Sequence, residues 1–258
     1  MGLARRRSAL KIEIIPCLKD NYAYLVSGDG LCAVIDPSEA APIEAALQAR
    51  GLKLTHILNT HHHWDHSGGN RELKDRFGAE IVGPEKDRNR IPAIDTGVDE
   101  AGGWRFAGQA VRILEVPAHT RGAIAFVMAG AVFTGDTLFA MGCGRLFEGT
   151  PAMMVESLAK IAALPDDTAL YCGHEYTLSN ARFAMTLEPG NRALGERMKE
   201  VEAARAAGKP TVPSTIGLEK QTNPFLRTGS AEIRSNLKME KADDVAVFAE
   251  IRRRKDVF

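Results

Sequence analysis

The feature that most constrains the fold of this chain is a run of histidines that comes directly after an apolar stretch. Four of the seven histidines fall within residues 61–66, in the string HHHWDH. Ile57 and Leu58 precede the run and Ser67 follows it, so a strand ends where a helix begins. Loops that follow rigid strands commonly carry functional side chains. The fold must therefore bring this strand end to a shared site.

The spacing inside the run offers two groups of ligands. His61 and His63 can point to the same side of an extended backbone, while Asp65 and His66 come one turn later and can point to a neighbouring position. Imidazole nitrogen and carboxylate oxygen are ligands that divalent Zn, Fe and Mn accept in proteins. The alternative is a solvated surface run of histidines, and the interleaved aspartate and the preceding strand argue against it.

Three later fragments each place one ligand-type residue after an apolar strand candidate. They are VPAHT with His119, FTGDT with Asp136 and YCGHE with His174. Alone, each has an ordinary explanation, because a single histidine after a strand is most often a structural residue and Gly-Asp-Thr is a common turn. Their recurrence at strand ends, together with the histidine run, predicts that they complete one metal site.

Composition places the chain among ordinary globular proteins. Its 258 residues carry 33 Lys and Arg against 33 Asp and Glu, and 45% are hydrophobic, which suffices for a large buried core. A net charge of zero removes the simplest argument for nucleic-acid binding, because phosphate recognition normally leaves a basic surplus. The longest nearly apolar stretch, 123–133, is well short of the roughly 20 residues that span a bilayer. We therefore expect neither a nucleic-acid partner nor a membrane.

Cysteine usage and the first residues bear on location. Cys17, Cys32, Cys143 and Cys172 form no C-x-x-C pair and no dense framework, which is typical of a reducing compartment. The start, MGLARRRSAL, has three arginines but no apolar run of signal-peptide length. We expect a solvated N-terminus, with a transit-type role as the alternative, and a cytoplasmic protein. We expect Cys143 in a loop and Cys172 in a buried strand.

The patterning changes near residue 178. Before it, short apolar runs alternate with Gly, Pro and Asp turns and with a few helices, which is typical of a mixed α/β domain. After it, helix formers dominate and no segment has the pattern of a strand. We expect a catalytic domain over 1–178 and a helical domain over 179–258, and Thr150 and Pro151 predict an N-cap and a first helical residue. The expected strands are 12–15, 22–26, 32–35, 56–59, 80–82, 111–116, 124–128, 132–133 and 169–172, and the expected helices are 42–50, 70–77, 151–164, 191–207 and 243–255.

Several motifs resemble those of a known family. The H-x-H-x-D-H motif of the metallo-β-lactamase superfamily stands here as residues 61–66. The strings FTGDTLF, GCGRLFEGT, YCGHEYT and TNPFLR are similar to those of glyoxalase II, the hydroxyacylglutathione hydrolases, within that superfamily. The resemblance extends through essentially the whole chain. It implies an α/β fold, the metallo-β-lactamase αβ/βα sandwich, with a smaller C-terminal helical domain that contributes to glutathione binding.

The same resemblance implies a binuclear centre of two divalent metal ions, with zinc expected and iron or manganese as alternatives. One ion would be held by His61, His63 and His119, the other by Asp65, His66 and His174, with Asp136 as the bridge. Water held between two such ions would ionise near neutral pH and serve as the nucleophile. Asp65 and Asp136 are therefore the expected catalytic residues.

The implied reaction is hydrolysis of S-D-lactoylglutathione to glutathione and D-lactate, the second step of methylglyoxal detoxification. Its thiolate leaving group has a pKa of about 8.5 to 9 and needs no strong general acid. Phe147 stands where many relatives have tyrosine, so we expect it to contribute shape only. The basic C-terminal run could instead be a helix end that complements its own dipole. The implied contacts to the glutathione moiety are Arg145, Phe147, Tyr176, Arg252 and Lys255.

Other activities occur on the same scaffold. A glutathione persulfide dioxygenase shares the motif set but uses a single iron, and its relatives lack the TNPFLR extension and the terminal basic run. A ribonuclease is disfavoured by the zero net charge, and a non-catalytic metal-binding module would need closed coordination without a water site. We expect a monomeric hydrolase whose partner is a small glutathione thioester. One further departure is Ala123, where relatives commonly have a histidine.

Overall fold

Two six-stranded sheets form the centre of the protein. The computed structural model describes residues 9–258, so the arginines on which the expected N-terminal behaviour rests lie outside the described residues. The strands of the first sheet follow chain order, and the sheet changes from antiparallel to parallel pairing at its third strand. These strands are β1 (Lys11–Cys17), β2 (Asn21–Gly28), β3 (Leu31–Ile35), β4 (His56–Leu58), β5 (Glu80–Pro84) and β6 (Thr96–Val98).

The second sheet has the order β14-β13-β10-β9-β8-β7. Among the described strands of this sheet, only β10 and β13 pair in parallel. The register of that pair shifts between Phe133 and Gly135, at the end of β10. The strands are β7 (Trp104–Phe106), β8 (Gln109–Glu115), β9 (Ile124–Met128), β10 (Ala131–Gly135), β13 (Ala169–Cys172) and β14 (Ser214–Thr215).

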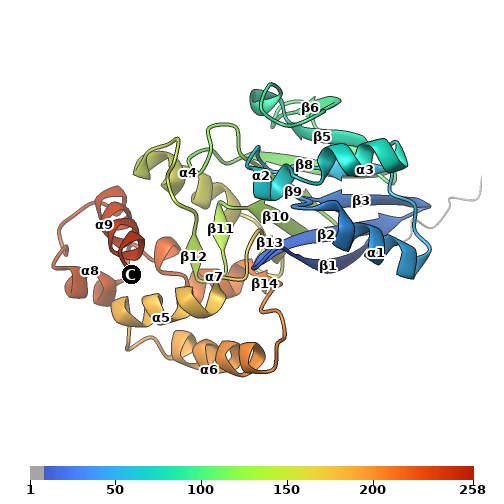
Figure 1. Ribbon diagram of the computed structural model, residues 1–258. Helices are drawn as coiled ribbons and strands as arrows, with labels where there is room; N and C mark the ends of the chain where they lie inside the picture. Colours follow the sequence, from blue (N-terminus) through green and yellow to red (C-terminus); the bar gives the residue numbers. More distant parts are fainter. Residues whose placement is uncertain (1–8) are drawn as a thin grey trace, which may run out of the picture.

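Apolar side chains from both sheets meet in the space between them. Tyr24 of the first sheet packs against Phe133 of the second, with ring centroids 5.5 Å apart. Helices α1 (Ala40–Arg50) and α3 (Asn70–Phe77) bury Ile43 and Leu73 on the outer face of the first sheet, and α4 (Pro151–Ala162) covers the second. The layers are therefore helix, sheet, sheet and helix, which confirms the expected αβ/βα sandwich (Figure 1).

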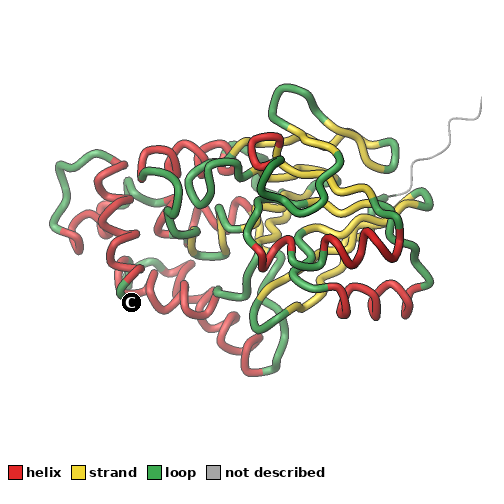
Figure 2. Tube along the Cα trace, turned by 45° about the horizontal axis from the view of Figure 1, so that its top comes forward, coloured by secondary structure: helices red, strands yellow, loops and turns green. Residues whose placement is uncertain are grey.

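The remaining helices gather at one end of the sandwich, where Figure 2 shows helix and loop but little strand. The last helix starts at a clear N-cap, because the Asp243 carboxylate accepts a hydrogen bond from the Ala246 N–H at 2.8 Å. The Thr150 cap and Pro151 start of α4 are also found as expected. These helices are α5 (Thr177–Leu187), α6 (Arg192–Ala206), α7 (Ile216–Thr222), α8 (Ala231–Leu237) and α9 (Asp244–Asp256).

The expectation that no strand follows residue 178 was wrong. Ser214 and Thr215 form β14, which pairs antiparallel with β13 through Leu170 and Ala169. Two residues cannot display an alternating pattern, so only the neighbouring strand reveals this one. The domain boundary near residue 178 stays a prediction.

Other short elements were missed for the same reason. Strands β11 (Leu138–Phe139) and β12 (Gly142–Cys143) form a small hairpin, so Cys143, expected in a loop, lies in a strand. A four-residue helix, α2 (Trp64–Ser67), starts inside the histidine run. Two single-turn helices span Glu85–Asp87 and Pro224–Leu226. None of the helices in the described part of the chain is long and apolar enough to cross a membrane.

Candidate metal centre

Strand ends from both sheets bring all seven expected ligands to one end of the sandwich. The run 61–66 follows β4, and the other three residues follow β8, β10 and β13. The last two strands are neighbours in parallel, so Asp136 and His174 leave the same edge of the sheet together. Loops that are distant in sequence thus converge on a single site.

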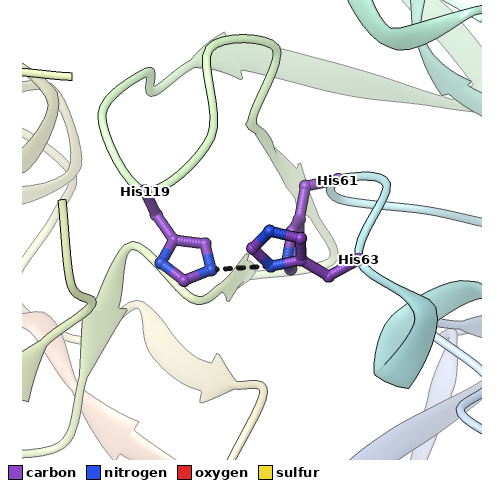
Figure 3. Close-up of side chains that lie close together, drawn as sticks. All are labelled: His61, His63 and His119. Atoms are coloured by element: carbon purple, nitrogen blue, oxygen red, sulfur yellow. Dashed lines mark hydrogen bonds between the residues drawn. The ribbon is translucent and has the colours of Figure 1, made fainter. Parts of the chain in front are cut away.

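A first group of ligand atoms consists of three imidazoles. The Nε2 atoms of His61 and His119 each lie 3.1 Å from Nδ1 of His63, and Figure 3 shows the rings turned toward one another. Burial lowers the pKa of all three: well below the ordinary value for His61, to about 4 for His63, and below it for His119. At neutral pH these rings are unprotonated, which is the state that binds a metal ion.

A second group combines a carboxylate with two imidazoles. Oδ2 of Asp65 lies 3.6 Å from Nε2 of His66 and 3.5 Å from Nε2 of His174. Both histidines are buried, whereas about a quarter of the Asp65 side chain is exposed. These separations leave room for one ion among the three side chains.

Asp136 lies between the two groups. Its Oδ1 atom is 3.3 Å from Nε2 of His66, and its Oδ2 atom is 3.3 Å from Nε2 of His174 and 3.5 Å from Nε2 of His119. Burial alone would raise the pKa of Asp136, but the two histidines His66 and His174 outweigh it and hold this pKa well below its ordinary range. The carboxylate is therefore ionised and faces ligands of both groups.

The residues present fit a bound cation. Nε2 of His66 and Oδ1 of Asp136 are buried, and neither has a hydrogen-bond partner although the two atoms are 3.3 Å apart. Unpaired buried polar atoms are costly, and an ion between them would satisfy both. Gly173 keeps this space open, since a Cβ there would lie 2.4 Å from Asp136 Oδ1 and 2.6 Å from His66 Cε1. Imidazole and carboxylate donors suit a divalent metal.

Acceptors outside the two groups fix the orientation of the rings, and the sequence analysis missed them. His66 Nδ1 donates to Asp36 at 3.1 Å, His174 Nδ1 to Asp20 at 2.9 Å, and His119 Nδ1 to the carbonyl of Arg145 at 2.9 Å. With the proton on Nδ1, each ring presents Nε2 to the centre. Asp36 directly follows β3 and Asp20 lies in the turn before β2, so the strand-end signal could have found both.

A cavity of about 520 Å³ extends from the metal ligands to helix α9. Three cations line it, and besides the proposed ligands Asp65 and Asp136 it has one further carboxylate, Asp256. Arg252 is 7% exposed, donates to the carbonyl of Cys143 at 2.8 Å and pairs with Asp256 at 2.9 Å. Arg145 is exposed and lies 3.7 Å from Asp256. Two of the predicted substrate cations, Arg145 and Arg252, thus meet at Asp256 in the cavity that the metal ligands also line.

Lys255 is the third cation. Its Nζ atom contacts Ser179 Oγ at 3.1 Å and lies over the rings of Phe183 and Phe258, at 5.3 and 5.1 Å from the centroids. Burial, helped by Arg252, lowers the pKa of Lys255 to about 8. This ammonium group therefore titrates close to physiological pH.

Two aromatic side chains flank the ligands. Tyr176 stacks on His174 with ring centroids 4.6 Å apart, and Phe147 lies 5.8 Å from the ring of His63 and 5.2 Å from that of His119. Phe147 is 60% exposed and forms the rim of the cavity. All five expected substrate contacts line this cavity, and a role in substrate binding stays a prediction for each.

Comparison with known proteins resolves the family. Residues 19–174 match the model of the metallo-β-lactamase superfamily, and residues 175–258 match that of the hydroxyacylglutathione hydrolase C-terminus. The hydroxyacylglutathione hydrolase of Methylococcus capsulatus (strain Bath) is 53% identical over 253 residues, covering 96% of this chain and 99% of the relative. The chain belongs to the hydroxyacylglutathione hydrolase family of the metallo-β-lactamase superfamily.

Solved structures of the superfamily share the fold. The B3 metallo-β-lactamase BLEG-1 superposes with a TM-score of 0.66 at 21% identity, covering 84% of this chain and 99% of that one. TTHA1623, solved in a di-iron-bound form, has a TM-score of 0.62 at 25% identity and covers 84% of this chain and all of its own. The expected fold class is thereby confirmed for this hydroxyacylglutathione hydrolase family member.

His56, His62 and Ala123 lie outside the two groups of proposed ligands. His56 is a strand residue of β4, as expected, and packs edge-on against Trp104 and Phe106. His62 turns away from the ligand groups and bonds Asp87 at 2.9 Å. Ala123, the departure from the family pattern, is buried in the core. His119 therefore takes its support from the carbonyl of Arg145.

Proposed function

We propose that this protein is a binuclear metal-dependent thioester hydrolase that converts S-D-lactoylglutathione to glutathione and D-lactate. The observation that carries the proposal is the ionised carboxylate of Asp136 between two groups of metal-ligand type. The family supports the substrate class, because relatives that match over nearly the whole chain are named hydroxyacylglutathione hydrolases.

Seven side chains would hold two divalent ions, zinc being our first choice and iron or manganese the alternatives. When bound, such ions lower the pKa of water and polarise a carbonyl oxygen. Burial keeps the imidazoles of the first ligand group unprotonated. Hydrogen bonds to acceptors outside the two groups orient the rings of His66, His174 and His119. The proposed ligands are His61, His63 and His119 for one ion, Asp65, His66 and His174 for the other, and Asp136 for both.

Substrate binding would rest on charge at the other end of the cavity. Glutathione carries two carboxylates and one ammonium group, so its thioesters are anionic. Arg145, Arg252 and Lys255 can hold the carboxylates there, while Tyr176 and Phe147 flank the acyl end next to the ligands. Bound in this way, the thioester carbonyl would lie next to Asp136.

The cysteines of the site do not compete as nucleophiles. Cys143 and Cys172 are buried, and burial raises the pKa of each thiol to about 12. Thiols at neutral pH are poor nucleophiles. The free, buried state of all four cysteines is consistent with a reducing compartment, and we propose a cytoplasmic, monomeric enzyme of methylglyoxal detoxification.

Metal analysis and a thioesterase assay on the same sample test this function. We expect two equivalents of metal per chain, anaerobic cleavage of S-D-lactoylglutathione, loss of activity with a chelator and recovery when metal returns. A single equivalent of iron, with oxygen consumption on glutathione persulfide and no thioester cleavage, would instead identify a dioxygenase.

A further inference from the structure

The middle histidine of the run takes part in a polar network outside the ligand groups. His62 Nδ1 lies 2.9 Å from Oδ2 of Asp87, a carboxylate that is 1% exposed, and its Nε2 lies 2.5 Å from Nη2 of Arg90. Because a guanidinium can only donate, Nε2 accepts and the ring proton faces Asp87. His62 thus joins a buried carboxylate to an arginine on the protein surface.

Arg90 extends the network to another loop. Its two terminal nitrogens both donate to the carboxylate of Glu148, one of them at 2.9 Å. Such forked pairs fix direction as well as distance. Glu148 belongs to the segment 144–149, which we call the strap, and the strap also carries Arg145 and Phe147. The network therefore ties the strap to the histidine run.

The strap in turn holds the turn around His119. Glu148 accepts from the N–H of Arg121 at 2.7 Å through its carboxylate and donates its own N–H to the carbonyl of Ala118 at 3.4 Å. Contact is close, because a Cβ on Gly149 would lie 2.4 Å from Cα of Ala118. The carbonyl of Arg145 accepts the Nδ1 proton of His119. Every one of these contacts joins the strap to a residue of the segment 118–121.

Ala118 is the reason that this support matters. It has a φ of 148°, a conformation that residues with a side chain rarely adopt. Strained backbone of this kind persists only where the surrounding structure over-determines it. Here it directly precedes His119, so relaxation of Ala118 would move a ligand of the proposed centre.

We propose that Arg90 and Glu148 are positioning residues, whose ion pair, seated on His62 and Asp87, locks the strap and the strained turn at Ala118 so that His119 keeps its place. They touch neither the ligand groups nor the cavity. Their importance for catalysis rests on the proposed function, whereas their hold on the strap does not. The pair acts as one unit, so losing either member releases the strap.

Hydrogen–deuterium exchange on the metal-free protein tests directly whether the Arg90–Glu148 ion pair holds the strap. In Glu148→Ala and in Arg90→Ala, amides of 118–122 and 144–149 should exchange about tenfold faster, while the core strands are unchanged. In the double variant these amides should exchange no faster than in either single variant. Glu250→Ala is the matched control, since it also removes a carboxylate that bonds arginine and has a pKa near 2, but on the exposed side of α9.

Zinc titration of the same proteins gives the second readout. In both single variants one of the two equivalents should bind about tenfold more weakly, and the other should bind as in the unsubstituted protein. Unchanged exchange in the strap, or additive effects of the two substitutions, would overturn the positioning role of Arg90 and Glu148. If the unsubstituted protein binds none of zinc, iron and manganese, the proposed function fails, and the exchange experiment still decides the role of Arg90 and Glu148.

Discussion

Arg252 and Asp256, one turn apart on helix α9, form an ion pair of 2.9 Å at the wall of the cavity. The same guanidinium donates to the carbonyl of Cys143 in the hairpin of β11 and β12 and lies over the ring of Phe225 at 5.2 Å. Its charge is therefore oriented by the fold before a substrate arrives, which reduces the ordering cost of binding.

Arg252→Ala should consequently impair both folding and substrate binding. We expect the free energy of unfolding to fall by about 1–3 kcal/mol, because buried partners lose a charged hydrogen bond. KM for S-D-lactoylglutathione should rise by at least about tenfold. Urea denaturation and steady-state kinetics measure the two effects. Arg253→Ala, which removes an exposed neighbour paired with Glu250, should change neither; equal KM values for both variants would contradict the binding role.

The lowered pKa of Lys255 predicts a pH dependence of substrate binding. With a pKa of about 8, the ammonium loses its charge as pH rises from 7 to 9, so KM for an anionic thioester should climb through this range. Lys255→Arg keeps its charge and should show a flatter KM profile. The substrate is the same in both proteins, so its own titration cancels in the comparison, and parallel profiles would exclude Lys255 as the titrating group.

The lowered pKa of Lys255 also makes the free energy of unfolding depend on pH. The folded-state pKa lies below that of an unfolded lysine, so between about pH 8 and pH 10.5 the folded chain binds fewer protons than the unfolded one. This group therefore makes stability increase with pH across that window. Below pH 8 its burial opposes folding at a constant level.

The ligands were readable from the sequence because the signal is local. The residues 61–66 form one short segment after β4, and a polar residue after an apolar strand stays at a strand end whatever the sheet order is. The carboxylates that accept hydrogen bonds from Nδ1 of these histidines are not local in the sequence. Asp20 is 154 residues from His174, and Asp36 is 30 residues from His66. The pairing of β3 with β4 brings Asp36 to His66, and the packing of the two sheets brings Asp20 to His174.

The fold was predictable to a similar limit. Strands of four or more residues show alternation or an apolar run, whereas β14 and the β11–β12 hairpin are two-residue elements that exist only through their neighbours. Arg252 illustrates the same limit for a side chain. The basic run around it reads as a solvated helix end, but the structure buries this one arginine against Phe225 and Cys143.

Asp136 should be needed for metal binding as well as for activity. Asp136→Asn keeps the shape but removes the charge that faces both groups, so hydrolysis should fall by more than about 100-fold, beyond the usual cost of outer-sphere changes. Zinc added to the metal-free protein should raise Tm, because a ligand stabilises the state that binds it, and this increase should shrink in the variant. Asp243→Asn, which retains a capping acceptor on α9, should behave like the unsubstituted protein. An undiminished zinc-dependent Tm increase in Asp136→Asn would refute the shared position of this carboxylate.

Gly173 offers the sharpest test of where an ion lies. A methyl group there would come within 2.4 Å of Asp136 Oδ1 and 2.6 Å of His66 Cε1, so Gly173→Ala must displace two proposed ligands. We expect zinc affinity to drop by about 10–100-fold, the range seen when support of a metal ligand is lost. Gly195→Ala is the control, because a Cβ at this helical position meets nothing within 4 Å and should stabilise α6 by up to about 1 kcal/mol. Isothermal titration with zinc compares the two variants, and wild-type affinity for both equivalents in Gly173→Ala would show that no ion occupies the space between Asp136 and His66.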